Sequence, residues 1–334
     1  MKTRKAKLGG SGHADTLKSM ANLAVTYRSQ GRWEEAEQLQ VQVMETHKTK
    51  LGDGHPDTLA SIANLASTYW NQGRWEEAEQ LELQVMETSK TKLGEDHPST
   101  LTSVANLAST YGKQGRLEEA ELLQVQVMEK IKTKLGEDHP DTLTSIANLA
   151  STFGKQGRWE EAEQLEVQVM EMSKTKLGAD HPDTLTSIAN LASTLWNQGR
   201  WEEAEQLEVQ VMETSKTKLG TDHPDTLMCM ANLAFTWEST GRNAEAIDLL
   251  KTCVTKQQQV LAHLIGVMVY LHPHPGPPGV ATYVRTGQQS IKTAIKAAVS
   301  KAPKGDWTKG QHDVLPIAAS IDAHMASHDG AGTP

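Results

Sequence analysis

A 42-residue period constrains this chain more than any other feature of its sequence. The segment 139–152 reads His-Pro-Asp-Thr-Leu-Thr-Ser-Ile-Ala-Asn-Leu-Ala-Ser-Thr. Close copies begin at His55, His97, His181 and His223, and an altered copy begins at His13. The units that begin at His55 and His181 differ at only four positions. Self-similarity at a fixed step of this length indicates an array of repeats, in which each unit packs on its neighbours.

The first half of a unit predicts one amphipathic helix. In the unit that begins at His55, apolar side chains recur at steps of three and four residues: Leu59, Ile62, Leu65, Ala66 and Tyr69. Pro56 suits the first helical position, where its missing N–H is not needed. Gly73 suits the left-handed turn that ends a helix. The sequence therefore predicts a helix that begins at Pro56 and ends before Gly73.

The second half of a unit predicts another helix, which starts at Trp75 and ends near Leu93. Its apolar stripe consists of Ala78, Leu81, Val85 and Met86. Acidic residues at its start and lysines at its end complement the helix dipole. Neither helix can bury its stripe alone, so neighbouring helical hairpins must stack to form the core. The predicted fold class is all-α.

The apolar and glycine positions of this unit resemble those of the tetratricopeptide repeat. The matching residues are Ile62, Leu65, Ala66, Tyr69, Gly73, Ala78, Leu81 and Val85. The 42-residue length, the Asn-Leu-Ala segment, the Gly-Arg-aromatic turn and the Lys-Leu-Gly…His-Pro-Asp connection resemble the kinesin light chain type of repeat more closely. The array is also similar to the repeat regions of fungal NLR-like (STAND) proteins. The resemblance implies a right-handed α-solenoid whose first helices line a groove.

Six tandem repeats are predicted between residues 13 and 261. Residues 1–12 are interpreted as the remnant of a preceding repeat, because residues 3–9 align with residues 88–94. The period is lost after residue 261. We expect an apolar segment and a Pro-rich linker over 262–279 and a low-complexity, poorly ordered tail over 280–334.

Composition argues against several classes of partner. The formal net charge of −9 argues against nucleic acid, which normally requires a basic face. No segment has the run of about 20 apolar residues that a membrane-spanning helix needs, so no membrane partner is expected. Cys229 and Cys253 occupy core-type positions and indicate buried thiols in a reducing compartment. These features predict a cytoplasmic protein.

No arrangement of residues predicts catalysis, a cofactor or a metal site. The repeat histidines each precede a helix, and packed helices lie about 8–10 Å apart, whereas a zinc ligand lies within about 2.1 Å of its metal. The segment Glu76-Glu77-Ala78-Glu79 is typical of a solvated first helical turn. Neither a phosphate-binding P-loop nor a Gly-x-Ser-x-Gly nucleophile motif is present. The sequence therefore disfavours an enzyme.

One asparagine recurs at the same position of all six units and is the first candidate for partner binding. The six residues are Asn22, Asn64, Asn106, Asn148, Asn190 and Asn232. The resemblance to tetratricopeptide arrays implies that this part of the first helix faces the groove. An amide there could both donate to and accept from a peptide backbone. The alternative is that each amide bonds to a neighbouring helix and fixes the stacking.

Two adjacent positions vary while the rest of the unit is nearly constant. They read Arg28-Ser29, Trp70-Asn71, Gly112-Lys113, Gly154-Lys155, Trp196-Asn197 and Glu238-Ser239. If these positions line the groove, Trp70 and Trp196 are exposed aromatic anchors, and Asn71 and Asn197 add polar contacts. Lys113 and Lys155 would then favour an acidic partner. The alternative is neutral variation at solvent-exposed positions.

Together these features favour a non-catalytic scaffold that binds a protein or peptide segment, extended or acidic in character. Two alternatives remain open. One is the sensor or regulatory repeat region of an NLR-like NTPase whose NTPase domain is absent from this chain. The other is a truncated gene remnant without function. The sequence leaves the oligomeric state and the identity of the partner open.

Overall fold

The structure, a computed structural model, describes the backbone of residues 14–271 and the side chains of residues 14–259. Every secondary-structure element within 14–271 is an α-helix, so the prediction of an all-α fold is confirmed. The helices are α2 (Ala14–Ser29), α3 (Trp33–Leu51), α4 (Pro56–Asn71), α5 (Trp75–Leu93), α6 (Pro98–Gln114), α7 (Leu117–Leu135), α8 (Pro140–Lys155), α9 (Trp159–Leu177), α10 (Pro182–Asn197), α11 (Trp201–Leu219), α12 (Pro224–Ser239) and α13 (Asn243–Leu271). The predicted remnant 1–12 and the predicted tail 280–334 lie outside the described residues.

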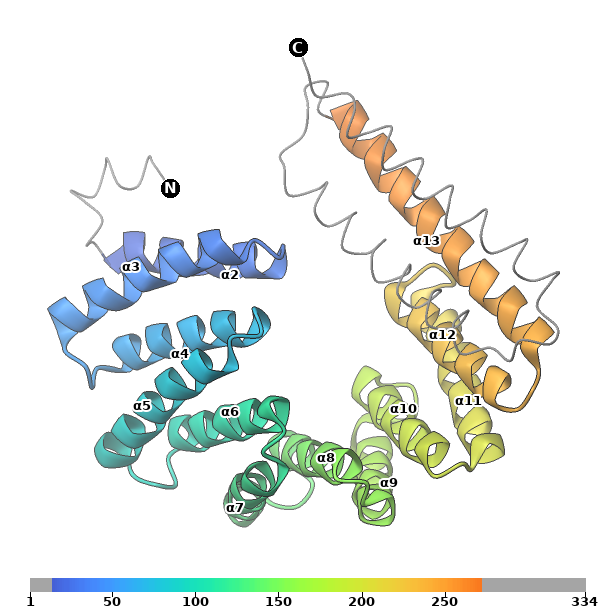
Figure 1. Ribbon diagram of the computed structural model, residues 1–334, viewed down its shortest axis with the longest axis horizontal. Helices are drawn as coiled ribbons and strands as arrows, with labels where there is room; N and C mark the ends of the chain where they lie inside the picture. The colour runs from blue at the N-terminus through green and yellow to red at the C-terminus, as the bar shows by residue number, and fades with distance from the viewer. Residues whose placement is uncertain (1–13, 272–334) are drawn as a thin grey trace. The chain divides into compact units, whose positions relative to one another are not determined.

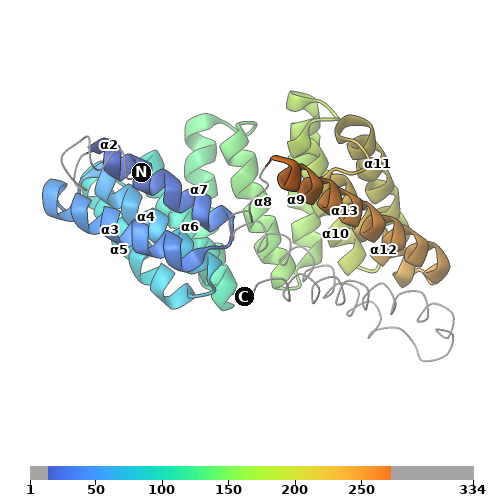
Figure 2. The same cartoon turned by 90° about the horizontal axis from the view of Figure 1, so that it is seen from above.

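The helices belong to two units, residues 1–200 and residues 201–334. In the first unit, α4, α6 and α8 line one side and α5, α7 and α9 line the other (Figure 1). The helices α2 and α4, one repeat apart in sequence, lie side by side (Figures 1 and 2). In the second unit, α12 packs against both α11 and α13. We call the exposed surface of α2, α4, α6, α8 and α10 the first-helix face.

Histidine caps the first helix of each repeat from α4 to α12. Pro56 occupies the first turn of α4, as predicted, and the His55 Nδ1 accepts a 3.1 Å hydrogen bond from the Asp57 N–H. The same bond, at 3.2–3.3 Å, is made by His97, His139, His181 and His223. Each imidazole thereby satisfies one of the N–H groups that a helix start leaves without a partner. The repeat histidines are helix caps.

Glycine ends both kinds of helix. Gly73 follows α4 with φ at +77°, and the Arg74 N–H donates back to the Tyr69 carbonyl at 3.0 Å. Gly94 follows α5 with φ at +94°, and its N–H donates to the Lys90 carbonyl at 3.1 Å. A Cβ disfavours this left-handed backbone. The two glycines therefore fix where each helix of the repeat ends.

The core is a series of small clusters, each formed between a first and a second helix. Leu59 and Ile62 of α4 pack with Val85 of α5. Ala78 is fully buried, as are its counterparts in four other second helices, Ala36, Ala120, Ala162 and Ala204. A side chain this small allows the two helix axes to approach closely. The predicted apolar stripe of the first helix is confirmed as the buried side of α4.

The buried side of the second helix differs from the predicted stripe. Ala78 and Val85 are buried, but Leu81 is only half-buried, while the polar residues Glu82 and Ser89 are buried. Positions 78, 82, 85 and 89 follow the helical period, so they form one continuous stripe. Two of its four members are polar. A prediction that selects only apolar residues therefore chooses Leu81 and overlooks Glu82.

An arginine–glutamate link joins each repeat from the second to the sixth to the one before it. The Arg74 Nη1 donates to Glu37 at 2.8 Å, and the Nε donates to Glu77 of its own repeat at 2.8 Å. The guanidinium also lies over the Tyr69 ring, 4.0 Å from its centroid. The link recurs in Arg116–Glu79, Arg158–Glu121, Arg200–Glu163 and Arg242–Glu205. A stacked, bidentate arginine of this kind fixes direction as well as distance.

The last helix is longer than the repeat pattern predicts. The sixth repeat is predicted to end at residue 261, whereas α13 continues to Leu271. Residues 262–271 contain no proline and a single glycine, Gly266, so the sequence offers no strong stop signal. The proline-rich part of the predicted linker begins at Pro273, outside the described residues.

Candidate partner-binding face

The six repeated asparagines lie on the first helices with their side chains open to solvent. Asn64 is half-buried, and the others are exposed: Asn22, Asn106, Asn148, Asn190 and Asn232. None of the six side-chain amides has a hydrogen-bond partner among residues 14–259. Asn232 belongs to the second unit, and the other five lie on the first-helix face. Each amide leaves two N–H donors and a carbonyl acceptor available.

Residues at the variable positions contact the next repeat along this face. The Arg28 Nη1 of α2 donates to the Ser67 Oγ of α4 at 2.8 Å. The Lys113 Nζ of α6 lies over the Trp70 ring of α4, 5.0 Å from its centroid. Both contacts join consecutive first helices. The variable positions therefore shape the junctions between repeats.

Trp70 differs from the expected exposed anchor. It is half-buried, and Lys113 lies over its ring. Its indole N–H is shielded from solvent without an acceptor among the described residues. Trp196, in contrast, is 37% exposed. Asn71 and Asn197 are exposed, and each donates its side-chain amide to a backbone carbonyl of its own helix, at 2.6 and 2.7 Å. Trp196 thus retains the exposure that an aromatic anchor needs.

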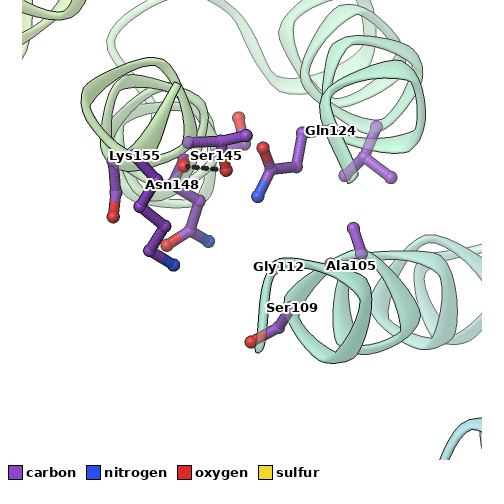
Figure 3. Close-up of a pocket in the computed structure, with 11 residues that line it drawn as sticks. Ala105, Ser109, Gly112, Gln124, Ser145, Asn148 and Lys155 are labelled. Atoms are coloured by element: carbon purple, nitrogen blue, oxygen red, sulfur yellow. Dashed lines mark hydrogen bonds between the residues drawn. The ribbon is translucent and has the colours of Figure 1, made fainter. Parts of the chain in front are cut away.

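A pocket of about 150 Å³ opens between α6, α7 and α8. Figure 3 shows Asn148 and Lys155 extending from α8 toward α6, with Gln124 reaching in from α7. Ser109 and Gly112 of α6 and Ser151 of α8 also line it. Two residues predicted from the sequence, Asn148 and Lys155, therefore meet in one pocket. Lys113, predicted with them, is not part of the lining and covers Trp70 instead.

The charges around this pocket favour an anion. Burial lowers the pKa of Lys155, and the neighbouring Lys113 lowers it further. Neither lysine forms an ion pair with an acidic side chain in the described part of the chain. Two nearby cations without a counter-charge repel each other, and an anion beside Lys155 relieves that repulsion.

Three carboxyl groups lie in the core of the array and not on the first-helix face. Glu82, Glu166 and Glu208 are 6%, 7% and 9% exposed. Burial raises the pKa of Glu82 to about 7, against the opposing effect of the Thr110 hydroxyl. Burial also raises the pKa of Glu166 and of Glu208. Each occupies the same position of its repeat, next to the following repeat.

The two cysteines of the chain lie in its second unit. Cys253 is buried and Cys229 is half-buried, both as free thiols, and burial raises the pKa of Cys253 to about 11. In the described residues no three His, Cys, Asp or Glu side chains are grouped so that they could hold a metal ion. Among the helices of that same region, none combines the length and the apolar character that crossing a membrane requires.

Two family models of the tetratricopeptide repeat match this helical region. One matches residues 14–91 and 58–129, and the other matches residues 142–183, 184–225 and 226–263. Together they cover well over half of the 334 residues. The chain belongs to the tetratricopeptide repeat family. Its repeats depart from the usual length of about 34 residues because the second helix is longer, as the 19 residues of α5 illustrate.

Solved structures refine this tetratricopeptide assignment. A kinesin light chain-like protein with nearly identical TPR-like repeats from Podospora anserina is 34% identical, over 62% of this chain and 98% of that one, with a TM-score of 0.54. A single-substitution variant of it is 33% identical, over 61% and 96%, with a TM-score of 0.55. BtubC (BKLC) from P. vanneervenii, at 17% identity over 78% and 94% and a TM-score of 0.52, shares the fold. No curated protein matches. The predicted kinesin light chain type of repeat is confirmed.

Sequence reasoning missed Gln124, one of the polar residues that line the pocket of this tetratricopeptide array. Ser109 and Ser151 also line it, and they occupy the repeat position of Ser67, which the family resemblance implies to face the groove. Gln124 lies on a second helix, which the family resemblance does not place on the groove. Its position corresponds to Glu82, on the buried stripe, so the helical period could have located it.

Proposed function

We propose that this tetratricopeptide chain is a non-catalytic scaffold that binds an extended segment of a partner protein across the first-helix face. One observation carries the proposal. Five unbonded amides recur on that face at the 42-residue step of the repeat: Asn22, Asn64, Asn106, Asn148 and Asn190. Polar groups already held on rigid helices need little further ordering when they bind a ligand.

The competing role for the asparagines is to fix the stacking of the repeats. That role requires each amide to bond to a neighbouring helix, and no such bond is present in the described residues. Other residues supply the contacts between repeats, among them the Arg74–Glu37 link and the Arg28–Ser67 hydrogen bond. The stacking is therefore accounted for without the asparagines, which favours the binding role.

The character of the partner follows from the variable positions. Lys113 and Lys155 favour an acidic segment, because no acidic side chain of the described region neutralises them. Trp196 offers exposed aromatic surface of the kind that contributes strongly to interfaces. We also propose the cytoplasm as the compartment, since the free thiols of Cys229 and Cys253 are typical of reducing conditions.

Affinity capture from cell extract tests the proposal. One variant replaces Asn64, Asn106, Asn148 and Asn190 with Ala. The matched control replaces four exposed amides on second helices, Gln38, Gln80, Gln126 and Gln164, with Ala. Circular dichroism establishes that both variants keep the helix content of the native chain.

The expected result is a set of partners that the native chain and the glutamine control retain and that the asparagine variant loses. The same set on all three proteins would place binding elsewhere, and the proposal would then be wrong. Sequencing the region of each partner that the native chain protects from protease would reveal whether the bound segments are acidic and extended.

A further inference from the structure

One side of α2 is open, whereas the matching side of every later first helix is covered. Thr26 is exposed and Leu23 is half-buried. Their counterparts in the next five repeats are at most 5% exposed: Thr68, Thr110, Thr152, Thr194 and Thr236, and Leu65, Leu107, Leu149, Leu191 and Leu233. We call the surface formed by Leu23, Thr26 and Gln30 of α2, with Arg32 directly after it, the open face.

In the later repeats the preceding second helix supplies polar partners to this side of the first helix. At the junction of α3 and α4, the Thr68 hydroxyl donates to Gln40 at 2.6 Å. Glu37 accepts from Arg74 at 2.8 Å and from Gln72 at 3.2 Å. A glutamine and an arginine share one glutamate in the same way at Glu79, Glu121 and Glu163. The same polar contacts therefore hold each of these junctions.

The corresponding polar groups of the open face bond only within the first repeat, as far as the described residues go. The Thr26 hydroxyl donates to the Asn22 carbonyl of its own helix at 3.0 Å. The Arg32 guanidinium pairs with Glu35 and donates to the Gln30 side-chain oxygen at 3.4 Å. Arg32 thus lacks the second glutamate that its counterparts have, and Thr26 lacks the amide or carboxyl group.

The first repeat also lacks an apolar contact that the later repeats receive. Met44 of α3 packs against Leu59 and Ile62 of α4, and Met86 of α5 packs against Leu107 of α6. The first cluster draws on α2 and α3 alone, and its members are Leu17, Met20, Val43, Ala21 and Leu39. A helix laid on the open face would bury the remaining apolar surface of α2, which favours binding.

The helices that cover the later repeats show what such a helix must carry. On α3 the covering residues are Glu37, Gln40 and Met44, with Val41 between them. They stand at positions i, i+3, i+4 and i+7, so they form one stripe along a single side of the helix. On the open face, the glutamate would neutralise Arg32 and the apolar pair would cover Leu23.

A second copy of this chain, joined end to end, would fit the open face poorly. The last second helix, α13, carries Ile247, Leu250, Lys251 and Val254 at the positions of the stripe. It offers no carboxylate for Arg32, and it places a lysine where the other second helices are apolar. The chemistry of the face therefore favours a helix of another protein.

We propose that the open face of α2 binds an amphipathic helix of another protein, which carries Glu, Gln, an apolar residue and Met at positions i, i+3, i+4 and i+7. This binding surface uses residues of α2 other than Asn22, and it does not depend on the proposed scaffold function. The bound helix occupies the place that a preceding second helix takes on α4, α6, α8, α10 and α12.

A capped peptide of residues 33–51, which has the sequence of α3, serves as the probe and is followed by fluorescence anisotropy with the full chain. The peptide variant Glu37→Gln removes the carboxylate of the stripe. Its matched control, Glu35→Gln, removes the same charge from the other side of the helix. The chain variants are Arg32→Gln and Thr26→Glu, and their control is Lys18→Gln, at an exposed position of α2.

We expect the native chain and Lys18→Gln to bind the native peptide and the Glu35→Gln peptide equally well. Glu37→Gln should weaken binding by about tenfold, as loss of a charge-assisted hydrogen bond does. Arg32→Gln should weaken binding to a similar extent and leave no further effect for Glu37→Gln, because the two residues form one pair. Thr26→Glu should abolish binding while circular dichroism stays native, since this position is exposed.

Binding that survives Thr26→Glu, or effects of Arg32→Gln and Glu37→Gln that simply add, would place the peptide elsewhere and overturn the inference. Failure of the native peptide to bind would do the same. Sedimentation velocity tests the second copy as occupant: self-association of the native chain that Thr26→Glu removes would contradict the assignment to another protein. The capture experiment with the asparagine variant does not involve the open face, so the two proposals fail separately.

Discussion

The Thr68 hydroxyl of α4 donates a 2.6 Å hydrogen bond to the side-chain oxygen of Gln40, which lies in the preceding repeat on α3. Both side chains are buried. The position of Gln40 is taken by Glu82, Gln124, Glu166 and Glu208 in the next four repeats. Three of these five repeats thus carry a carboxyl group where the other two carry a neutral amide, and each carboxyl lies against the following repeat. The buried carboxyl groups make stability depend on pH.

Glu82→Gln is expected to stabilise the protein at pH 8 and to have little effect at pH 4.5. The folded-state pKa of Glu82 is raised from 4.5 to about 7 by burial. The protonated Glu82 carboxyl therefore contributes fully to the free energy of unfolding below about pH 4.5. This contribution is lost as the pH rises to about 7, where the buried group ionises. The expected gain at pH 8 is on the order of 2 kcal/mol. Urea denaturation at both pH values measures it.

The control for that experiment is Glu76→Gln, at an exposed position of the same helix. It should change the free energy of unfolding by less than about 0.5 kcal/mol at either pH. An equal gain from Glu82→Gln at pH 4.5 and pH 8 would show that ionisation of the buried carboxyl is not the cause.

Arg116→Lys is expected to lower the melting temperature by breaking a link between repeats. A lysine cannot reach Glu79 and Glu119 together while stacking on Tyr111, as the guanidinium does. Arg32→Lys is the matched control, because within the described residues Arg32 pairs with Glu35 of its own repeat and with no glutamate of another. Thermal melts followed by circular dichroism should show a larger loss for Arg116→Lys. The opposite order would contradict the role of the link in stacking.

His139→Ala is expected to destabilise the fold by about 1 kcal/mol, the usual effect of losing a helix cap. The His139 Nδ1 accepts the Asp141 N–H at 3.2 Å. His139→Asn keeps a side-chain acceptor at the cap position and should retain most of the stability. Chemical denaturation of the two variants at pH 8 separates these outcomes. Similar losses for Ala and Asn would mean that the imidazole acts through packing.

Ala120→Leu is expected to destabilise the protein by about 1–3 kcal/mol through overpacking. Ala120 is fully buried against Leu107 and Tyr111, where the two helices approach each other. Leu122→Ala, on the same helix but 60% exposed, should change stability by less than about 0.5 kcal/mol. Equilibrium unfolding in urea measures both. A tolerated Ala120→Leu would mean that this interface adjusts to added volume.

Local signals in the sequence locate the helices well. Pro56 and Gly73 bracket the first helix, and Leu59 and Ile62 mark its buried side, because backbone restriction and helical period act within a few residues. The Arg74–Glu37 link escapes such reasoning, since its partners are 37 residues apart and meet only after the repeats stack. Glu82 escapes it as well, because an acidic residue on a helix is usually solvated.

The pocket was predictable only in part. Asn148 and Lys155 were identified by recurrence and by variation within one chain. The expected exposure of Trp70 was wrong, because the lysine that covers it belongs to the next repeat. The opening at Gly112 depends on what a neighbouring helix leaves unfilled. A pattern read along one helix contains no information of that kind.

The two residues of each arginine–glutamate link are 37 positions apart in the sequence, and this spacing limits how the array can change during evolution. Loss of residues 97–138 removes one whole unit and places Glu79 at the same 37-residue distance from Arg158 that Glu121 has now. The new neighbours would meet the same charges, caps and alanines as the old ones. We therefore expect gene copies that differ by whole 42-residue units to fold alike. Unequal crossing-over could then lengthen or shorten the surface offered to a partner in single steps, without a new interface.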